Sequence, residues 1–388
     1  MRLVLPTAVL LVTLAGSAYG QSTPSGTTNR SVIDEDPMPS SRAAALGGAL
    51  STTADDFDAA FHNPAGIGGL GLGKQRPPLI RKLYFPEVTV AANPNSTKLY
   101  NEFQKQGGAS DSAIGAGIVD ANAGKEQYGR ANVMGGIVFG RTLVAPFSDM
   151  QMAATAKDDG SGLINLHYRS MTGVGVGFSA QDSEGRISLG YFGYTATRQE
   201  IQGDVAYTDI VDKSKRAEAL KDDEATYSGA GHNVGLIYRL GKRLAPTLAV
   251  SVTNLGDTHF RKTGGASNLS GDLVDKQDMT VGFSLSPQLG KVGICHFTLE
   301  AGRLSEENVS LLKKYRLGSE LLLGGEGSYA TFALRGGYNY TGASAGFALN
   351  LGLISLAATT YSVDIGTGND TVTERREMAT FTVNVASF

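Results

Sequence analysis

Histidine and acidic residues that could do chemistry are present, but their spacing matches no catalytic or metal-binding pattern. The five histidines are scattered, with neither an H-E-x-x-H motif nor a second histidine at ligand spacing. Residues 364–370, DIGTGND, hint at a calcium loop, although Gly and Asp at this density are more typical of a hairpin turn. The sequence therefore predicts neither an enzyme nor a metal or cofactor site.

Two glycine patterns similar to nucleotide-binding motifs overlap near the N-terminus. Residues 66–71 fit G-x-G-x-x-G, and residues 68–74 fit G-x-x-x-x-G-K. The first motif needs a strand before it and a helix after it, and the second needs Ser or Thr after the lysine. Gln75 and then Pro77–Pro78 follow instead, and the prolines prevent a helix. We predict no phosphate site here.

A third group of residues consists of charged and amide side chains that alternate with apolar ones. These side chains could bind a polar ligand, or they could bind one another. The members of the group are His167, Arg169, Arg239, His296, Glu300, Arg316, Glu320, Arg335 and Asn339. Two roles stay open, a structural network of ion pairs and direct contact with a ligand. Since a buried unpaired charge is unfavourable, arginine should face glutamate on a neighbouring strand, and we predict a pair between Arg335 and Glu320.

The elements that must position these residues are β-strands, because apolar and polar residues alternate with a period of two. Between Ala330 and Tyr340 the even positions are mainly apolar and the odd ones mainly polar. After a turn at residues 341–343 the alternation restarts and continues to Leu351. From Ala131 onward roughly fourteen such segments of about ten residues follow, the length that a tilted membrane strand needs.

Local patterns predict a few further elements. A first strand is expected at residues 83–92, a short amphipathic helix at 95–106 and a weaker strand at 204–211. A charged loop follows at residues 212–224, and residues 306–314 should form one or two helical turns.

Composition narrows the class of protein. The chain has 388 residues, 51 glycines, no Trp and a formal net charge of -3, which is too near neutral to indicate a nucleic-acid partner. Its single cysteine, Cys295, excludes an internal disulfide and any multi-cysteine metal site. Frequent glycine without a collagen period indicates many turns and close backbone contacts.

The N-terminus predicts export. Arg2, an apolar run and small residues up to Gly20 form a signal peptide over residues 1–20, and no cysteine follows to carry a lipid. No later stretch is long enough for a transmembrane helix, so insertion into a membrane must use strands. A soluble sandwich would alternate too, but the polar face carries Gly, Ser, Asn, Arg, Glu and His on strand after strand, as a wet lumen would. We therefore predict an all-β, antiparallel transmembrane β-barrel.

Short motifs at both ends of the chain resemble one known group of barrels. A-x-G-G-A, A-D-D and N-P-A-G follow in order at residues 45–49, 54–56 and 63–66, and R-x-G-x-N stands at 335–339. This order resembles the long-chain fatty-acid transporter (FadL-type) and PorV-type outer-membrane proteins. The resemblance implies a barrel of about fourteen strands with an N-terminal plug inside the lumen. Its plug motif would comprise Asp55, Asp56, Asn63, Pro64, Ala65 and Gly66.

The resemblance also implies an organisation and two alternative functions. The signal peptide (1–20) would precede an N-terminal extension with the plug (21–80) and an outer-membrane barrel (81–388). One function is passive uptake of hydrophobic small molecules, with outer-membrane lipid and a hydrophobic ligand as partners. The other is a non-transporting, PorV-like partner barrel that binds an exported protein. Neither function needs a cofactor.

Overall fold

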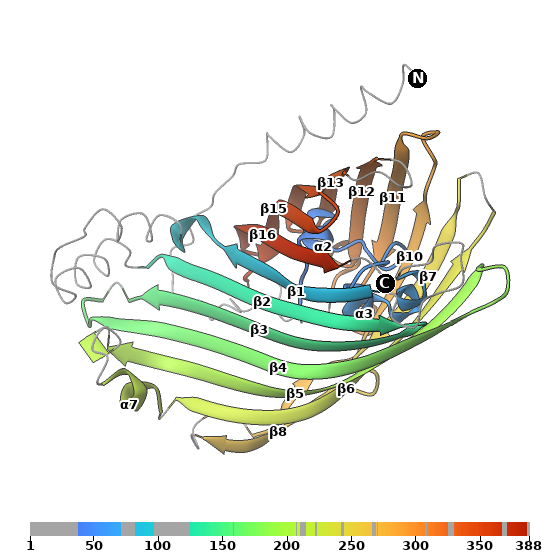
Figure 1. Ribbon diagram of the computed structural model, residues 1–388. Coiled ribbons are helices and arrows are strands. Elements are labelled where there is room, and N and C mark those ends of the chain that lie inside the picture. Colours follow the sequence, from blue (N-terminus) through green and yellow to red (C-terminus); the bar gives the residue numbers. More distant parts are fainter. Residues whose placement is uncertain are drawn as a thin grey trace.

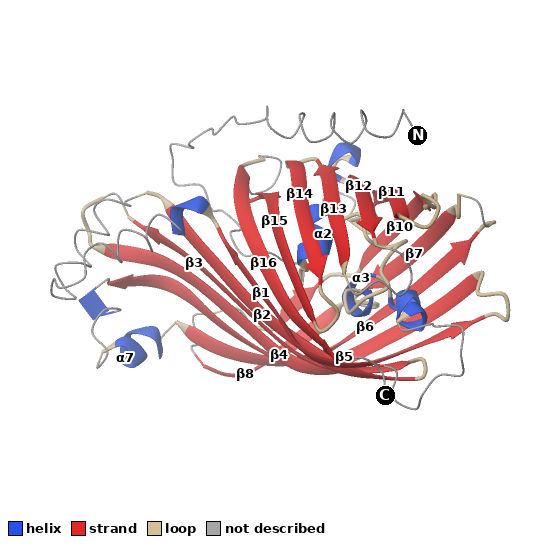
Figure 2. Cartoon of the chain, turned by 45° about the horizontal axis from the view of Figure 1, so that its top comes forward, coloured by secondary structure: helices blue, strands red, loops and turns tan. Residues whose placement is uncertain are grey.

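A computed structural model shows a closed β-barrel with a segment of the chain inside it (Figures 1 and 2). Within the described residues the sheet has sixteen strands, and every neighbouring pair is antiparallel. The pairing of β5 (Ile187–Ala206) with β6 (Glu224–Arg239) closes the ring. The structure describes residues 38–70, 82–96, 124–157, 159–206, 208–209, 215–221, 223–241, 244–265, 269, 271–306, 309–324, 330–366 and 371–385.

Most of the other strands pair with the strands that come before and after them in the chain. The exception is the hairpin of β8 and β9, which pairs with β6. The other strands are β1 (Lys82–Ala92), β2 (Glu126–Phe139), β3 (Thr142–Ala156), β4 (Leu163–Gln181), β7 (Thr247–Thr253), β8 (Thr258–Gly265), β9 (Leu273–Asp275), β10 (Asp278–Leu285), β11 (Gly293–Ala301), β12 (Tyr315–Leu323), β13 (Thr331–Asn339), β14 (Gly342–Asn350), β15 (Ile354–Asp364) and β16 (Thr373–Val385). Outside the barrel wall lie the helix α7 (Arg216–Lys221) and the 3₁₀ turn η2 (Leu311–Lys313). No helix among the described residues is long and apolar enough to cross a membrane.

Two of the barrel strands are interrupted. β6 pairs with β7 over its second half and with β8 over its first half, so β7 and β8 act as one barrel strand with a break at residues 254–257. β10 pairs with β7 and β9 pairs with β8, so β9 and β10 make the next barrel strand in the same way. The sixteen strands thus form a barrel of fourteen, which confirms the expected architecture.

The connections give the barrel its orientation. At one end the strands are joined by the short stretches 140–141, 182–186 and 351–353, whereas at the other end residues 93–125 and 207–223 make long connections. Outer-membrane barrels have short periplasmic turns and longer extracellular loops. The end with the long connections is therefore extracellular.

The barrel wall differs in height around its circumference. β4 and β5 have 19 and 20 residues, whereas β11, β12, β13 and β14 have 9 each. We call β3–β6 with β8 and β9 the tall wall, and β11–β14 the low wall. Figure 1 shows the long strands of the tall wall opposite the shorter strands β11–β13. Since a membrane strand needs about ten residues, the tall wall rises beyond the membrane on the extracellular side.

The outer surface of the barrel is apolar, as the alternation predicted. On β4, Val174, Val176 and Phe178 point outward and are 47%, 47% and 54% exposed, while the intervening glycines face the interior. Outward apolar residues on other strands continue this band, among them Leu189, Leu248, Leu299, Phe347 and Phe381. Because nothing in the described part of the chain covers the band, it is the surface that contacts lipid.

Several local predictions need correction. The prediction of a separate, weaker strand at residues 204–211 is wrong, because β5 continues without a break through Ala206 and residues 208–209 are helical. Of the one or two helical turns predicted at 306–314, the 3₁₀ turn Leu311–Lys313 is present, and residues 307–308 lie outside the described residues. The signal peptide (1–20) and most of the helix expected at 95–106 lie outside the described residues.

Residues 38–70, the lumen segment, lie inside the barrel (Figure 2). This segment contains the helices α2 (Ser41–Ala45) and α3 (Ala59–His62) and the 3₁₀ helix η1 (Pro64–Gly69). α2 packs against β13–β16, and η1 packs against β3–β6. The segment thereby bridges the lumen from one wall to the other, and most of the protein core forms around it.

Candidate functional site

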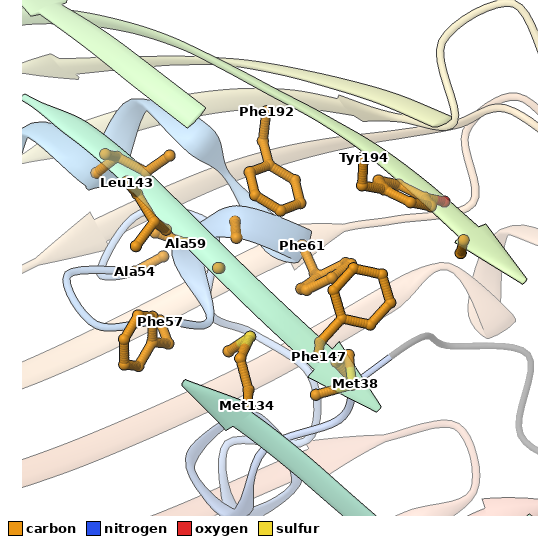
Figure 3. Close-up of a cluster of buried hydrophobic side chains, with 14 of the residues drawn as sticks. Met38, Ala54, Phe57, Ala59, Phe61, Met134, Leu143, Phe147, Phe192 and Tyr194 are labelled. Atoms are coloured by element: carbon orange, nitrogen blue, oxygen red, sulfur yellow. The ribbon is translucent and has the colours of Figure 1, made fainter. Parts of the chain in front are cut away.

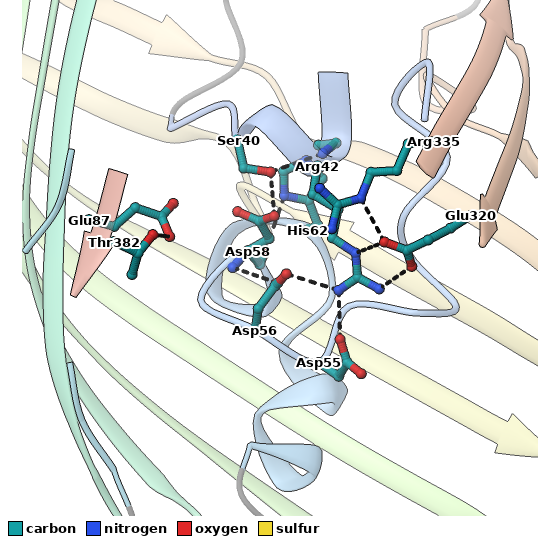
Figure 4. A network of polar contacts seen from close by, with 11 residues as sticks. Ser40, Arg42, Asp55, Asp56, Asp58, His62, Glu87, Glu320, Arg335 and Thr382 are labelled. Carbon is teal, nitrogen blue, oxygen red and sulfur yellow. Dashed lines mark hydrogen bonds and ion pairs between the residues drawn. The ribbon is translucent and has the colours of Figure 1, made fainter. Parts of the chain in front are cut away.

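Arg42 connects the lumen segment to the low wall (Figure 4). It lies on α2, and its Nη1 donates to Asp55 Oδ1 at 2.6 Å and to Asp56 Oδ2 at 2.9 Å. On the other side its Nη2 donates to Glu320 Oε2 at 2.7 Å, on β12. One guanidinium therefore holds together α2, the loop before α3 and the barrel wall.

Glu320 is shared between the lumen segment and the wall. The strand register places it opposite Arg335 on β13, and Arg335 Nε lies 2.7 Å from Glu320 Oε1. The Glu320 side chain is only 1% exposed, and those of Arg335 and Arg42 are 10% exposed. The predicted pair of Arg335 with Glu320 is present, and Arg42 joins it as a second guanidinium that the sequence analysis missed. A buried carboxylate between two guanidinium groups has its charge compensated.

Asp58 fastens the two halves of the lumen segment to each other. The Ser40 hydroxyl caps α2 by accepting from the backbone N–H of Ala43, and it donates to the Asp58 carboxylate immediately before α3. Burial raises the pKa of Asp58 well above its usual range, and the negative charges of Asp56 and Glu87 raise it further. Asp58 therefore keeps its proton to a higher pH than a surface aspartate does.

Further polar contacts join the low wall to the backbone of the lumen segment. Glu300 on β11 accepts from the backbone N–H of Ser51 at 2.5 Å and from its hydroxyl at 2.6 Å. Asn339 and Arg316 donate, at 3.4 Å each, to the carbonyl oxygens of residues 47–48. These three wall residues thus satisfy backbone groups that the short, irregular segment leaves without helical partners.

The N-P-A-G sequence forms a compact turn at the start of η1. Asn63 Oδ1 accepts from the backbone N–H of Ala65 at 3.1 Å, and Pro64 occupies the first position of the 3₁₀ helix. Gly66 packs so closely on the loop before α3 that a Cβ there would lie 1.7 Å from the carbonyl oxygen of Ala54. Asn63, Pro64 and Gly66 therefore each have a structural reason for their residue type.

The tall wall receives this turn on glycines. A Cβ added to Gly190 on β5 would lie 2.0 Å from the carbonyl carbon of Pro64, and one added to Gly235 on β6 would lie 1.9 Å from Asn63 Oδ1. No other residue type leaves room for a backbone to approach a strand so closely. These positions fix where the lumen segment meets the wall.

Phe61 is at the centre of an apolar cluster between the lumen segment and the tall wall (Figure 3). Its ring centroid lies 5.2 Å from those of Phe147 and Phe192, in edge-to-face geometry, and 5.9 Å from that of Tyr194. The other large members of the cluster are Met38, Leu46, Leu50, Phe57, Ile67, Leu70, Met134, Val138, Leu143, Met171, Tyr227 and Phe260. Since Phe260 lies on β8, the cluster extends from the lumen segment into the extracellular part of the tall wall.

A second charged group lies higher on the tall wall. Glu200 accepts from Arg169 at 2.9 Å and from Arg198 at 2.5 Å, and His167 Nε2 lies 3.6 Å from it. Arg198 also pairs with Asp275 on β9 at 2.9 Å. The charges in this group are matched, and none of these contacts involves the lumen segment.

The predicted polar residues therefore fall into separate places. Glu300, Arg316, Glu320, Arg335 and Asn339 gather around the lumen segment, whereas Arg169 belongs to the upper group. Arg239 lies near the periplasmic end, where it donates to the Gly185 carbonyl at 3.3 Å and to the Ser188 hydroxyl at 3.1 Å. His296 accepts or donates at 2.7 Å with the Ser286 hydroxyl.

Arg42 and Phe61 were missed because both lie in a segment without period-2 alternation. The available signals were a single arginine within a run of small residues that is followed by two aspartates, and two phenylalanines, Phe57 and Phe61, shortly before N-P-A-G. With the segment inside the barrel, Arg42 can pair with a charged residue of the wall and Phe61 with an aromatic one.

The polar groups of the described interior match neither a metal site nor a nucleophile elbow. Among the described residues no group of three or more His, Cys, Asp or Glu side chains is placed to hold a metal ion. Residues 342–346, GASAG, fit the G-x-S-x-G pattern of a nucleophile elbow, but they lie within strand β14 and not at a turn from a strand to a helix.

Comparison with solved structures identifies the fold. A TodX channel for monoaromatic hydrocarbons (deltaS2S3 mutant) superimposes with a TM-score of 0.55 at 11% identity, over 89% of this chain and 98% of that one. The Ralstonia pickettii toluene transporter TbuX gives a TM-score of 0.48 at 13% identity, over 89% of this chain and 97% of that one. No protein-family model and no curated protein sequence matches the chain.

The chain therefore shares its fold with TodX, a closed barrel with strands of the same general arrangement. The apolar outer band and the short periplasmic turns identify it as a barrel of the outer membrane. At 11% identity the likeness carries no information about individual residues.

Proposed function

We propose that this protein is a channel for passive movement of hydrophobic small molecules across the outer membrane. The observation that carries the proposal is the apolar cluster around Phe61, which lines the interior of the barrel from the lumen segment to the extracellular part of the tall wall. A pore for polar solutes has a polar, water-filled interior. An aromatic interior instead favours molecules that leave water readily.

The division of the lumen into two sides supports this proposal. The low wall binds the lumen segment through the carboxylates of Glu320 and Glu300, whereas the tall wall offers it aromatic and aliphatic side chains. The charged side of the lumen holds the segment in place. A hydrophobic ligand therefore gains most binding free energy on the apolar side, where it replaces contacts between the segment and the tall wall.

The lumen segment acts as the plug of this channel. Its Phe61 occupies the space between Phe147, Phe192 and Tyr194, where an aromatic ring finds two edge-to-face neighbours and one tilted one. A monoaromatic hydrocarbon presents the same surface, and TodX is described as a channel for this class. The substrate class we assign is therefore small aromatic or aliphatic hydrocarbons and fatty-acid-like molecules.

Uptake into proteoliposomes tests the proposal. The barrel is reconstituted as the full chain, as a deletion of residues 21–73, as Phe61→Ala and as Phe347→Ala, and labelled hydrocarbon or fatty acid is added outside. We expect flux above protein-free vesicles for the full chain, a several-fold change for the deletion and for Phe61→Ala, and wild-type flux for Phe347→Ala, which alters only the lipid-facing surface. No ligand-dependent flux in any variant would contradict the channel and leave a barrel that only binds a partner protein.

A further inference from the structure

Two leucines at the extracellular rim of the low wall are strongly exposed. Leu311 and Leu312, in the 3₁₀ turn η2, are 68% and 80% exposed, and Leu312 is the most exposed large apolar side chain among the described residues. Single exposed apolar residues are common on protein surfaces, but two adjacent ones on a fixed turn indicate a contact.

The turn is held on the outer side of the barrel. Lys313 Nζ lies 5.2 Å from the centroid of the Tyr340 ring and 3.3 Å from Asp364 Oδ2. By alternation, Asp364 at the end of β15 shares the outward parity of Leu356, which is 46% exposed, and Tyr340 lies in the turn that follows β13. Lys313 therefore reaches past the β13–β14 turn to an outward-facing residue of β15.

A second tether fixes the other end of the turn. Lys314 Nζ donates to the carbonyl oxygen of Glu306 at 2.7 Å, and its backbone N–H donates to the carbonyl oxygen of Leu311 at 3.0 Å. Both lysines are thus engaged with the protein, and the leucines before them are held away from it.

The position of the turn continues the lipid-facing surface. β12 begins at Tyr315, directly after η2, and its outward residues Tyr315 and Leu317 are 49% and 50% exposed. Each low-wall strand has 9 residues. At about 3.4 Å per residue and a tilt of about 40°, nine residues span roughly 23 Å, slightly less than the apolar band of about 25 Å that such barrels present to lipid. The wall is short where the leucines lie, and mismatch of this kind is relieved by apolar residues next to the strand ends.

We infer that η2 is a membrane-contact element whose leucines, Leu311 and Leu312, insert among the acyl chains of the outer leaflet. It extends the apolar band of the low wall upward and holds the rim of the barrel at the level of the membrane on this side. The partner is lipid, because the leucines continue the surface that already faces lipid. This inference is independent of what passes through the lumen.

Collision accessibility of a spin label tests the inference. In a Cys295→Ala background, Leu312→Cys is labelled with a nitroxide and the full chain is reconstituted in phosphatidylcholine vesicles. References are Leu317→Cys in the lipid-facing band and Ser161→Cys in the exposed turn between β3 and β4. The ratio of collisions with oxygen to collisions with a water-soluble nickel chelate should place position 312 with Leu317 and at least about tenfold away from Ser161.

Two results would overturn the inference. A ratio equal to that of Ser161 means that the turn lies in water, and shielding from both reagents means that protein, such as a second copy, covers it. Leu311→Cys provides an independent second position on the same turn. Lys313→Gln in the Leu312→Cys chain should move the ratio toward that of Ser161 and increase label mobility, and an unchanged ratio would refute the role of the Lys313 tether.

Discussion

Replacing Arg42 by methionine should release the lumen segment from the low wall while leaving the barrel intact. The change removes the donors to Asp55 at 2.6 Å, to Asp56 at 2.9 Å and to Glu320 at 2.7 Å, and it keeps most of the apolar stem of the side chain. Arg42 makes no strand pairing, so the hydrogen bonds of the barrel are unaffected.

The size of the effect follows from the burial of each partner. Breaking a buried ion pair is unfavourable by about 3–5 kcal/mol, but Glu320 retains Arg335, so its share falls to the lower end of that range or below. Asp55 and Asp56 are 66% and 39% exposed, and pairs of this kind contribute about 0–1 kcal/mol each. We expect docking of the segment to weaken by about 3 kcal/mol, which corresponds to a roughly 100-fold larger undocked population.

Limited proteolysis of the folded barrel measures this population, because cleavage within residues 38–70 requires the segment to open and, when reclosing is fast, proceeds in proportion to the open fraction. Arg42→Met should be cleaved about 100-fold faster than wild type. Arg169→Met is the matched control, since Arg169 also pairs with a glutamate in the lumen but does not touch the segment. Equal cleavage rates for Arg42→Met and wild type, or for the two variants, would refute the assignment of Arg42 as the tether.

Three other perturbations have expected outcomes. Gly190→Ala places a Cβ 2.0 Å from the Pro64 backbone and should also speed proteolysis of the lumen segment, by a shift of about 1–3 kcal/mol, whereas an unchanged rate would show that η1 does not dock on β5. The raised pKa of Asp58 favours the neutral carboxyl group in the docked segment. The contribution of Asp58 to docking is therefore complete below the ordinary carboxyl pKa and is lost as the pH rises through the raised pKa. Protection of the lumen segment from proteolysis should fall with rising pH, and Asp58→Asn should flatten this pH profile. Val176→Arg puts a charge on the lipid-facing band and should destabilise the barrel in bilayers by about 2–4 kcal/mol, measured by urea unfolding, while no loss would contradict the outward placement of β4.

The barrel was predictable because its strands carry their own pattern. On β4, Val174, Val176 and Phe178 alternate with glycines, and this alternation predicts both the strand and its two faces. Once the faces are known, residues on neighbouring strands can be paired, as Arg335 and Glu320 show. Alternation does not show where a long strand ends, and the separate strand predicted at residues 204–211 therefore overlaps the last part of β5, which runs to Ala206.

The interior site was only partly predictable, because its other half comes from a segment without periodicity. Glu320 and Glu300 could be assigned to the lumen from their own strands, but their partners Arg42 and Ser51 lie 278 and 249 residues away in sequence. Glycines at 190 and 235 could be recognised as inward-facing, yet only the folded chain shows that Pro64 and Asn63 occupy the space they leave.

Photolabelling of the lumen tests the central claim most directly. A photoreactive monoaromatic hydrocarbon is added to the reconstituted full chain, and the crosslinked residues are mapped by mass spectrometry with and without excess unlabelled hydrocarbon. The apolar cluster predicts competed labelling at Phe61, Phe147, Phe192 and Tyr194. Labelling confined to lipid-facing residues such as Phe178, or labelling that unlabelled hydrocarbon does not reduce, would contradict a hydrophobic path through the barrel.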